Sequence, residues 1–333
     1  MTRADLAAAI LWTGATLYAL FGGADFGGGA WDLVAGLDDR KGAAPRARIQ
    51  QSLTPVWEAN HVWLIFILVV LWTAFPDAFG AIMSTLYVPI ALAALGIVLR
   101  GAGFAFRKSI RRFEYRRAMG AAFALSSVIT PFFMGTVVGA IAAGNVPAKG
   151  NGDAFSTWLQ PLPLLTGALF VASGAYLAAI FLVIDSRRGG DAAMEDYFAR
   201  RALWAAGVAG LFALAGIFAL HSEARYVFDR LTAEGLPLVL VSALCGIGVL
   251  ALLLRGARLG LRPLAGGAVV AVIWGWGVAQ FPYLLPTSLK IDQSAAPGPT
   301  LDAVVVVFAV AAIVVLPALG LLYWLSQREL LGE

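Results

Sequence analysis

The sequence predicts an all-α polytopic membrane protein, and its composition, its long uncharged runs and its charge distribution all indicate this class. Of the 333 residues, 60% are hydrophobic and only 13% are charged, with a mean hydropathy of +0.81. A soluble domain is about half apolar and about a quarter charged. The composition therefore excludes an ordinary soluble enzyme, a disordered chain and a nucleic-acid-binding protein. The single cysteine, Cys245, excludes an internal disulfide framework.

Nine runs without Lys, Arg, Asp or Glu are close to or above the length of about 20 apolar residues that crosses a bilayer. Such runs must be helices or strands of a closed barrel, and these do not alternate as barrel strands do. The sequence therefore predicts nine transmembrane helices, over residues 6–24, 59–76, 78–99, 118–148, 154–184, 202–221, 235–254, 263–289 and 303–327.

Individual runs carry further signals. The first has no sizeable basic leader and ends in glycines, so we expect a retained helix and not a cleaved signal. Pro89, Pro131 and Pro317 should kink the third, fourth and ninth spans, because proline removes an amide donor from the helix. Pro282 and Pro286 should break the eighth span near its outer end.

The basic residues predict the orientation. If the N-terminus lies outside, the segments on its side hold five of the 24 Lys and Arg residues, and the opposite segments hold nineteen. Basic residues resist translocation and remain cytoplasmic. We therefore predict an outer N-terminus and a cytoplasmic C-terminus. This count places Arg100 and the basic stretch 107–117 in the cytoplasmic connection after the third span.

The connections between the predicted spans are short. The longest are the cytoplasmic segment 32–54 and the outer segment 144–160. Neither is long enough to fold alone as a hydrophilic domain, so we expect one transmembrane domain over residues 1–333.

Few ionisable residues are available inside the membrane, where a buried charge costs about 2.5–3.5 kcal/mol or more. Asp25 ends the first span, and Glu58 and His61 begin the second, so all three should lie near the cytoplasmic face. Glu58 and His61 are three residues apart and share a helix face. Gly23 and Gly27 form a small-xxx-small pair that would admit a neighbouring helix. This grouping suggests a site of proton entry.

Structural roles for the same residues remain open. Glu58 falls in the first turn of its helix, where a carboxylate complements the helix dipole. Asp25 could lie close enough to the interface to be hydrated, and His61 could be a hydrogen-bonded core residue.

Redox cofactors are constrained by the residue counts. The only two histidines, His61 and His221, fall on opposite faces in the predicted topology, so one haem held by both is not expected. A single cysteine excludes an iron–sulfur cluster. We expect no metal site in this chain, and the cofactors of any electron transfer should sit in a partner chain.

Several segments, in order along the whole chain, carry a resemblance to a known family. They are GADFGGG at 23–29, PVWEANHVWL at 55–64, AFP at 74–76, LRGAGFAFR at 99–107, TPFFMG at 130–135, FPY at 281–283, PTS at 286–288 and LYW at 322–324. With these segments the chain resembles subunit II of the cytochrome bd-type quinol oxidases, which reduce dioxygen to water with electrons from quinol.

The resemblance implies two four-helix bundles plus one peripheral helix, in a heterodimer in the bacterial cytoplasmic membrane. The homologous subunit I would carry haem b, haem d and the quinol-oxidising site. Subunit II would stabilise it and supply a cytoplasmic proton pathway. The resemblance also allows for a structural quinone in this chain, bound membrane lipids and a small accessory subunit.

Four residues are candidates for the proton pathway, and family positions map onto two of them. Asp25 and Glu58 occupy the acidic positions of the first two segments, and Asn60 and His61 would hold waters or orient Glu58. A second acid often found three residues before the first is Gly22 here, which departs from the family pattern.

Two other functions remain as alternatives. One is a structural scaffold without a role in proton transfer. The other is a secondary transporter, which would usually place its charged site near the midplane and show inverted repeats. Neither feature is seen in this sequence.

Overall fold

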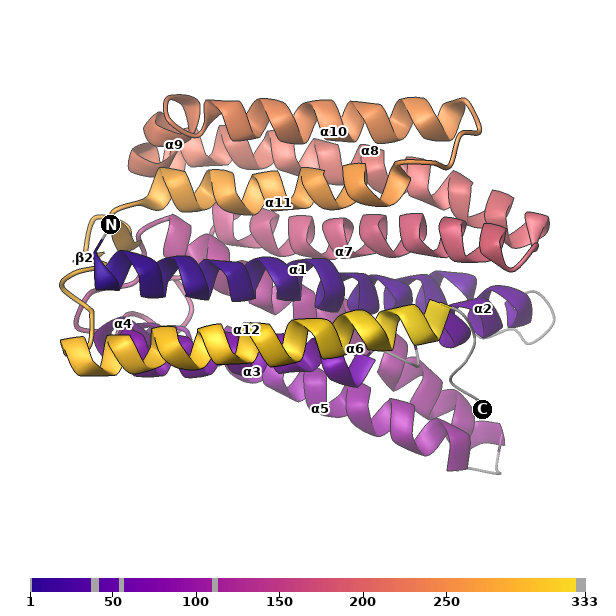
Figure 1. Cartoon of the computed structure of the whole chain (residues 1–333), viewed down its shortest axis with the longest axis horizontal. Coiled ribbons are helices and arrows are strands. Elements are labelled where there is room, and N and C mark those ends of the chain that lie inside the picture. The colour runs from indigo at the N-terminus through magenta and orange to yellow at the C-terminus, as the bar shows by residue number, and fades with distance from the viewer. Residues whose placement is uncertain (1, 37–41, 54–56, 110–112, 328–333) are drawn as a thin grey trace.

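The computed structural model of the chain describes residues 2–36, 42–53, 57–109 and 113–327. These residues form long helices that run side by side, with a small hairpin at one end (Figure 1). The elements are α1 Arg3–Ala35, α2 Ala43–Leu53, α3 Trp57–Ala74, α4 Pro76–Thr85, α5 Tyr87–Ser109, α6 Phe113–Ala142, α7 Pro161–Arg188, α8 Ala192–Glu223, α9 Arg225–Thr232, α10 Leu236–Leu254, α11 Leu261–Gln280, β1 Tyr283–Leu285, β2 Leu289–Lys290 and α12 Gly298–Gln327.

Seven of the helices in the described part of the chain are long and apolar enough to cross a membrane: α1, α6, α7, α8, α10, α11 and α12. Residues Asn60–Ala74 of α3 meet this test only together with α4, which is bent from them by 118°. The apolar part of α5, Tyr87–Gly103, is shorter than the other spans. The all-helical class is confirmed, whereas the count of nine and the orientation of the termini remain predictions.

The third predicted span, 78–99, is wrong as a single helix. It is divided at Leu86 between α4 and α5. Pro76 opens α4, and Pro89 lies in the first turn of α5, where a helix tolerates the missing amide. Pro89 therefore begins a helix and does not kink one.

The ends of two other predicted segments also differ from the structure. The eighth span ends at Gln280, before Pro282, so the predicted break is confirmed and the span is shorter than 263–289. After it, β1 and β2 pair as an antiparallel hairpin. At the other end, the segment 32–54 is not a simple connection, because α1 continues to Ala35 and buries Asp32, and α2 follows.

The long helices form two groups of four. One group contains α7, α8, α10 and α11, and the other contains α1, α3, α5 and α6 (Figure 1). The groups meet where α7 packs against α1 and α6, and α12 lies outside them against α1 and α3. This arrangement supports the expected pair of four-helix bundles with one peripheral helix.

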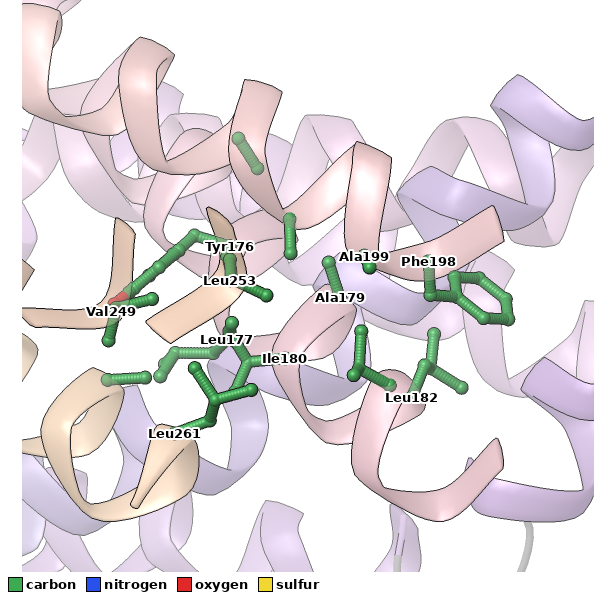
Figure 2. Close-up of a cluster of buried hydrophobic side chains, with 14 of the residues drawn as sticks. Tyr176, Leu177, Ala179, Ile180, Leu182, Phe198, Ala199, Val249, Leu253 and Leu261 are labelled. Atoms are coloured by element: carbon green, nitrogen blue, oxygen red, sulfur yellow. The ribbon is translucent and has the colours of Figure 1, made fainter. Parts of the chain in front are cut away.

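A buried apolar cluster holds the first group together. It includes Leu177 and Ile180 from α7, Phe198 from α8, Val249 from α10 and Leu261 from α11 (Figure 2). All five side chains are almost fully buried. Since interhelical association in lipid depends on close van der Waals packing, this cluster fixes the positions of α7 and α8 relative to the other helices.

Glycines allow the two groups to meet closely. A Cβ atom added at Gly27 of α1 would lie 1.9 Å from the carbonyl oxygen of Gly174 in α7. A Cβ atom added at Gly174 would lie 2.6 Å from the carbonyl oxygen of Gly23. The predicted close approach of a helix beside Asp25 is confirmed at Gly27, whereas a Cβ atom added at Gly23 would meet nothing within 4 Å.

Candidate functional site: a buried polar cluster between four helices

Asp25 is the centre of a polar cluster inside the second group of helices. Its side chain on α1 is only 2% exposed. Asn60 of α3, which is also buried, donates a hydrogen bond from Nδ2 to Asp25 Oδ2 over 2.6 Å. The structure thus brings together two of the four residues predicted from sequence. The suggestion that Asp25 could be hydrated at the interface is wrong, because the carboxylate is enclosed by protein.

Arg100 of α5 provides the opposite charge and is 1% exposed. Its Nη2 atom donates to the backbone carbonyl oxygen of Asp25 over 2.9 Å, and its Nη1 atom donates to Ser127 Oγ of α6 over 2.5 Å. Ser127 in turn donates to the carbonyl oxygen of Phe123 over 2.6 Å. One guanidinium therefore joins α5 to both α1 and α6.

Aromatic rings cover the faces of the same guanidinium. Its Cζ atom lies 4.8 Å from the centroid of the Phe26 ring and 4.7 Å from that of Phe123. A cation over an aromatic face is attracted by the ring quadrupole, more strongly when water is excluded. The charge also interacts electrostatically with Asp25, Tyr18 and the buried Asp32. Together these contacts compensate a charge that would be costly if it were isolated.

Room for Arg100 depends on a glycine. A Cβ atom added at Gly29 of α1 would lie 2.0 Å from Ser127 Oγ and 3.0 Å from Arg100 Nη1. The run of glycines after Asp25 thus lets both a neighbouring helix and a large side chain approach α1.

The other two predicted residues are on α3. His61 is partly buried, and its ring lies 6.0 Å from that of Phe26 at an interplanar angle of 30°, which places it at the edge of the cluster. Glu58 falls in the first turn of α3, and its side chain lies outside the described residues. The pairing of Glu58 with Asn60 or His61 therefore remains a prediction.

Arg100, Ser127 and Asp32 were missed by the sequence reasoning. Arg100 was assigned to a connection between two spans, and that assignment is wrong, because Arg100 lies within α5, which continues to Ser109, and is buried there. A signal was available: Arg100 stands between the apolar run 87–99 and a Gly-Ala-Gly segment, away from the other basic residues of its region. A basic residue in such a setting is a candidate for an interior charge.

The placement of the metal-ligating side chains in the described residues does not favour a redox metal site. Within the described residues no three His, Cys, Asp or Glu side chains come together in a way that could hold a metal ion. His61 lies near the start of α3, and His221 lies near the end of α8 beside Arg225. These two positions are at opposite ends of the bundle, so the histidines cannot hold the same haem.

Comparison with known proteins gives one consistent family. The family model described as cytochrome bd terminal oxidase subunit II matches residues 4–326. Cytochrome bd ubiquinol oxidase subunit 2 of Bacillus subtilis (strain 168) is 23% identical over 303 residues, covering 89% of this chain and 86% of the relative. Cytochrome bd-I ubiquinol oxidase subunit 2 of Escherichia coli (strain K12) is 24% identical over 316 residues, covering 83% and 80%.

The fold is also similar to a solved structure. A chain of the bd oxidase from Geobacillus thermodenitrificans superposes with a TM-score of 0.83 and 25% sequence identity, and the match covers 98% of each chain.

Proposed function

Because this chain belongs to the cytochrome bd terminal oxidase subunit II family, we propose that it is the haem-free subunit that brings protons from the cytoplasm to the oxygen-reducing site of its partner. It is an integral membrane subunit of a quinol oxidase and works with a subunit I. Family membership favours this function over a secondary transporter. The bacterial relatives support a location in the bacterial cytoplasmic membrane.

The observation that carries the proposal is the hydrogen bond from Asn60 to the buried carboxylate of Asp25. A carboxylate enclosed by protein is expensive and usually functional in a membrane. This one is held by a neutral amide, while the guanidinium of Arg100 contacts the backbone carbonyl of the same residue. The carboxylate is thus positioned without a direct hydrogen bond from Arg100 among the described contacts, so it retains the capacity to bind and release a proton.

The path that we propose begins at Glu58 and continues to Asp25, with Asn60 and His61 holding waters between them. Reduction of dioxygen consumes protons. If those protons come from the cytoplasm while quinol protons leave on the outer side, charge is separated across the membrane without a pump.

The surface of α3 suggests where subunit I docks. Val62, Ile65, Val69 and Trp72 form an exposed apolar stripe on this helix, next to Asn60 and His61 in sequence. The stripe adjoins the buried pair of Asn60 and Asp25, so a subunit docked on it would lie beside the proposed proton pathway. We propose that subunit I covers this stripe and receives protons there.

Replacing the acids in the assembled complex tests the proton pathway. We expect Asp25→Asn and Glu58→Gln to slow quinol-driven oxygen consumption by about a hundredfold or more, since a positioned proton donor typically contributes about 10²–10⁴-fold, while the haem spectrum stays normal. The matched control is Asp77→Asn, an exposed acid in the first turn of α4. If both acid variants turn over and take up protons like the control, the chain is a scaffold and the pathway is wrong.

A second experiment tests the proposal that haem b and haem d are bound by the partner. The variants His61→Ala and His221→Ala should leave the haem absorbance of the complex unchanged, because the two histidines lie apart and outside any shared metal site in the described residues. Loss of a haem signal in either variant would overturn the proposed division between the subunits.

A further inference from the structure

A shallow groove of about 410 Å³ runs along the side of the molecule where α1, α6, α7 and α8 meet. Its lining includes Trp31 of α1, Phe132 of α6 and Ala168 of α7. From α8 it includes Trp204, Val208 and Phe212. The groove lies on α8, whereas the apolar stripe assigned to subunit I lies on α3, so it is separate from the proposed proton pathway.

The α8 segment that lines the groove is close to the length of one leaflet. Trp204, Val208 and Phe212 follow one another at four-residue intervals, and so share one face of α8. From the first to the third, the helix rises about 12 Å, against about 15 Å for half of the hydrocarbon core. Trp204 is 77% exposed at one end, in the position that interfacial tryptophans take.

The next residue on the same face is basic. Arg200 precedes Trp204 by four positions and is exposed. Among the described residues it makes no hydrogen bond and no ion pair. It stands just before the uncharged run 202–221, at the end of the helix where the basic residues of the sequence gather. This face of α8 therefore presents Arg200, which is unpaired within the described part of the chain, at the membrane surface and the apolar groove below it.

The side chains that line the groove indicate which kind of molecule it can bind. Its lining side chains are all apolar or aromatic, and Trp31 Nε1 already donates to the carbonyl oxygen of Ala175 over 2.8 Å. A quinone headgroup needs convergent polar groups, which the lining does not offer.

We propose that this groove binds one anionic phospholipid of the cytoplasmic leaflet, with an acyl chain between Trp31 and Phe212 and the headgroup phosphate on Arg200. Anionic headgroups are attracted by basic residues at the membrane surface. The bound lipid would fill the seam between the two helix groups, since α1 and α6 belong to one and α7 and α8 to the other.

Native mass spectrometry of the assembled complex tests the site, with phosphatidylglycerol and phosphatidylcholine as probes. We expect the wild-type complex to retain one phosphatidylglycerol in preference to phosphatidylcholine. Arg200→Gln should reduce this preference by about fivefold, the effect of one surface arginine. The control Arg188→Gln removes an exposed basic residue at the end of α7, outside the groove, and should not change the preference.

Two further variants test the apolar part. Ala168→Phe fills the groove from α7, and Val208→Trp fills it from the exposed face of α8, where the larger side chain displaces no buried neighbour. Both should abolish retention of the lipid at normal oxygen consumption. The proposal is overturned if Val208→Trp still retains phosphatidylglycerol, if Arg200→Gln and Arg188→Gln behave alike, or if the molecule displaced is a quinone. Retention of the lipid is measured without turnover, so failure here is distinguishable from failure of the proton pathway.

Discussion

Arg100 Nη2 donates a hydrogen bond over 2.9 Å to the carbonyl oxygen of Asp25, the residue whose carboxylate accepts a hydrogen bond from Asn60. Asp25 is therefore held at its backbone by α5 and at its side chain by α3. Because two helices fix the same residue, the position of the carboxylate depends on the packing of the whole helix group. Changes to this packing should affect both stability and proton delivery.

Removal of the buried guanidinium should be strongly destabilising. We expect Arg100→Ala to cost about 3–5 kcal/mol, since breaking a buried charge network leaves the remaining partners unpaired. Arg100→Lys should recover part of this loss, because an ammonium keeps the charge but cannot bond to Asp25 and Ser127 in the same forked geometry. Thermal unfolding of the complex measures both variants, with Arg188→Ala as an exposed control.

If Arg100→Ala melts at the temperature of the Arg188→Ala control, the cluster is not part of the stable core. The contacts of Arg100 with Phe26 and Phe123 would then have little energetic value.

Two glycines on the same helix offer a matched test of the contact between the helix groups. At Gly27 an added methyl group would lie 1.9 Å from the Gly174 carbonyl oxygen, whereas at Gly23 it would meet nothing within 4 Å. Overpacking costs about 1–3 kcal/mol, so Gly27→Ala should lower the melting temperature of the complex. Gly23→Ala should leave it unchanged or slightly raised, because alanine favours the helix. Equal effects of the two variants would contradict the close approach of α7.

Much of the fold follows from the sequence, because the bilayer requires uncharged helices of a certain length. The runs that became α1, α6, α7 and α8 could be recognised without any tertiary information. The break between α4 and α5 was missed because hydropathy continues through it and only Pro89, in the first turn of α5, marks it. Hydropathy measures whether a segment can enter lipid and does not measure its direction.

The site could be predicted only in part, for a related reason. Asp25 was found because a carboxylate inside an apolar run is unusual, and Asn60 because it accompanies Glu58 in a resembling segment. Arg100 was missed because the rule that places basic residues in cytoplasmic connections treats every arginine alike. What makes this arginine different is its burial against α1 and α6, which is a property of tertiary packing.

A cap that crosses between helices gives a further prediction. Glu223, at the end of α8, accepts a hydrogen bond through Oε2 from the backbone amide of Leu162 over 3.0 Å. This amide is in the first turn of α7 and has no partner within its own helix. We expect Glu223→Ala to destabilise the complex by about 1 kcal/mol, the usual value of an N-terminal cap. The control is Glu234→Ala, whose exposed ion pair with Arg230 should be worth much less.

Thermal unfolding at low and high salt would further distinguish the effect of Glu223→Ala from that of Glu234→Ala. The Glu223 effect should persist at high salt, because its partner is a backbone amide, whereas any effect of Glu234 should be screened. A Glu223→Ala variant that matches Glu234→Ala at both salt concentrations would show that the cap does not stabilise α7.

The connection between α6 and α7 contains a carboxylate whose titration should be visible in the pH dependence of stability. Asp153 Oδ1 accepts hydrogen bonds from the Ser156 amide over 2.7 Å, the Ser156 hydroxyl over 2.8 Å and the Phe155 amide over 3.1 Å. The Ser156 amide is the largest cause, and together these donors lower the pKa of Asp153 below its usual value, which is about 3.9. A pKa lowered in the folded state adds stability above the unfolded pKa, and this stability is lost as the pH falls through the folded pKa.

The wild-type complex should therefore be more stable than an Asp153→Ala variant at neutral pH, and the difference should shrink below about pH 4. Asp153→Asn keeps an oxygen acceptor without the charge, so its stability relative to Asp153→Ala should not depend on pH in this range. Thermal unfolding of the three proteins between neutral and acidic pH measures this. A wild-type advantage that grows as the pH falls would contradict the lowered pKa, because protonation would then strengthen the turn.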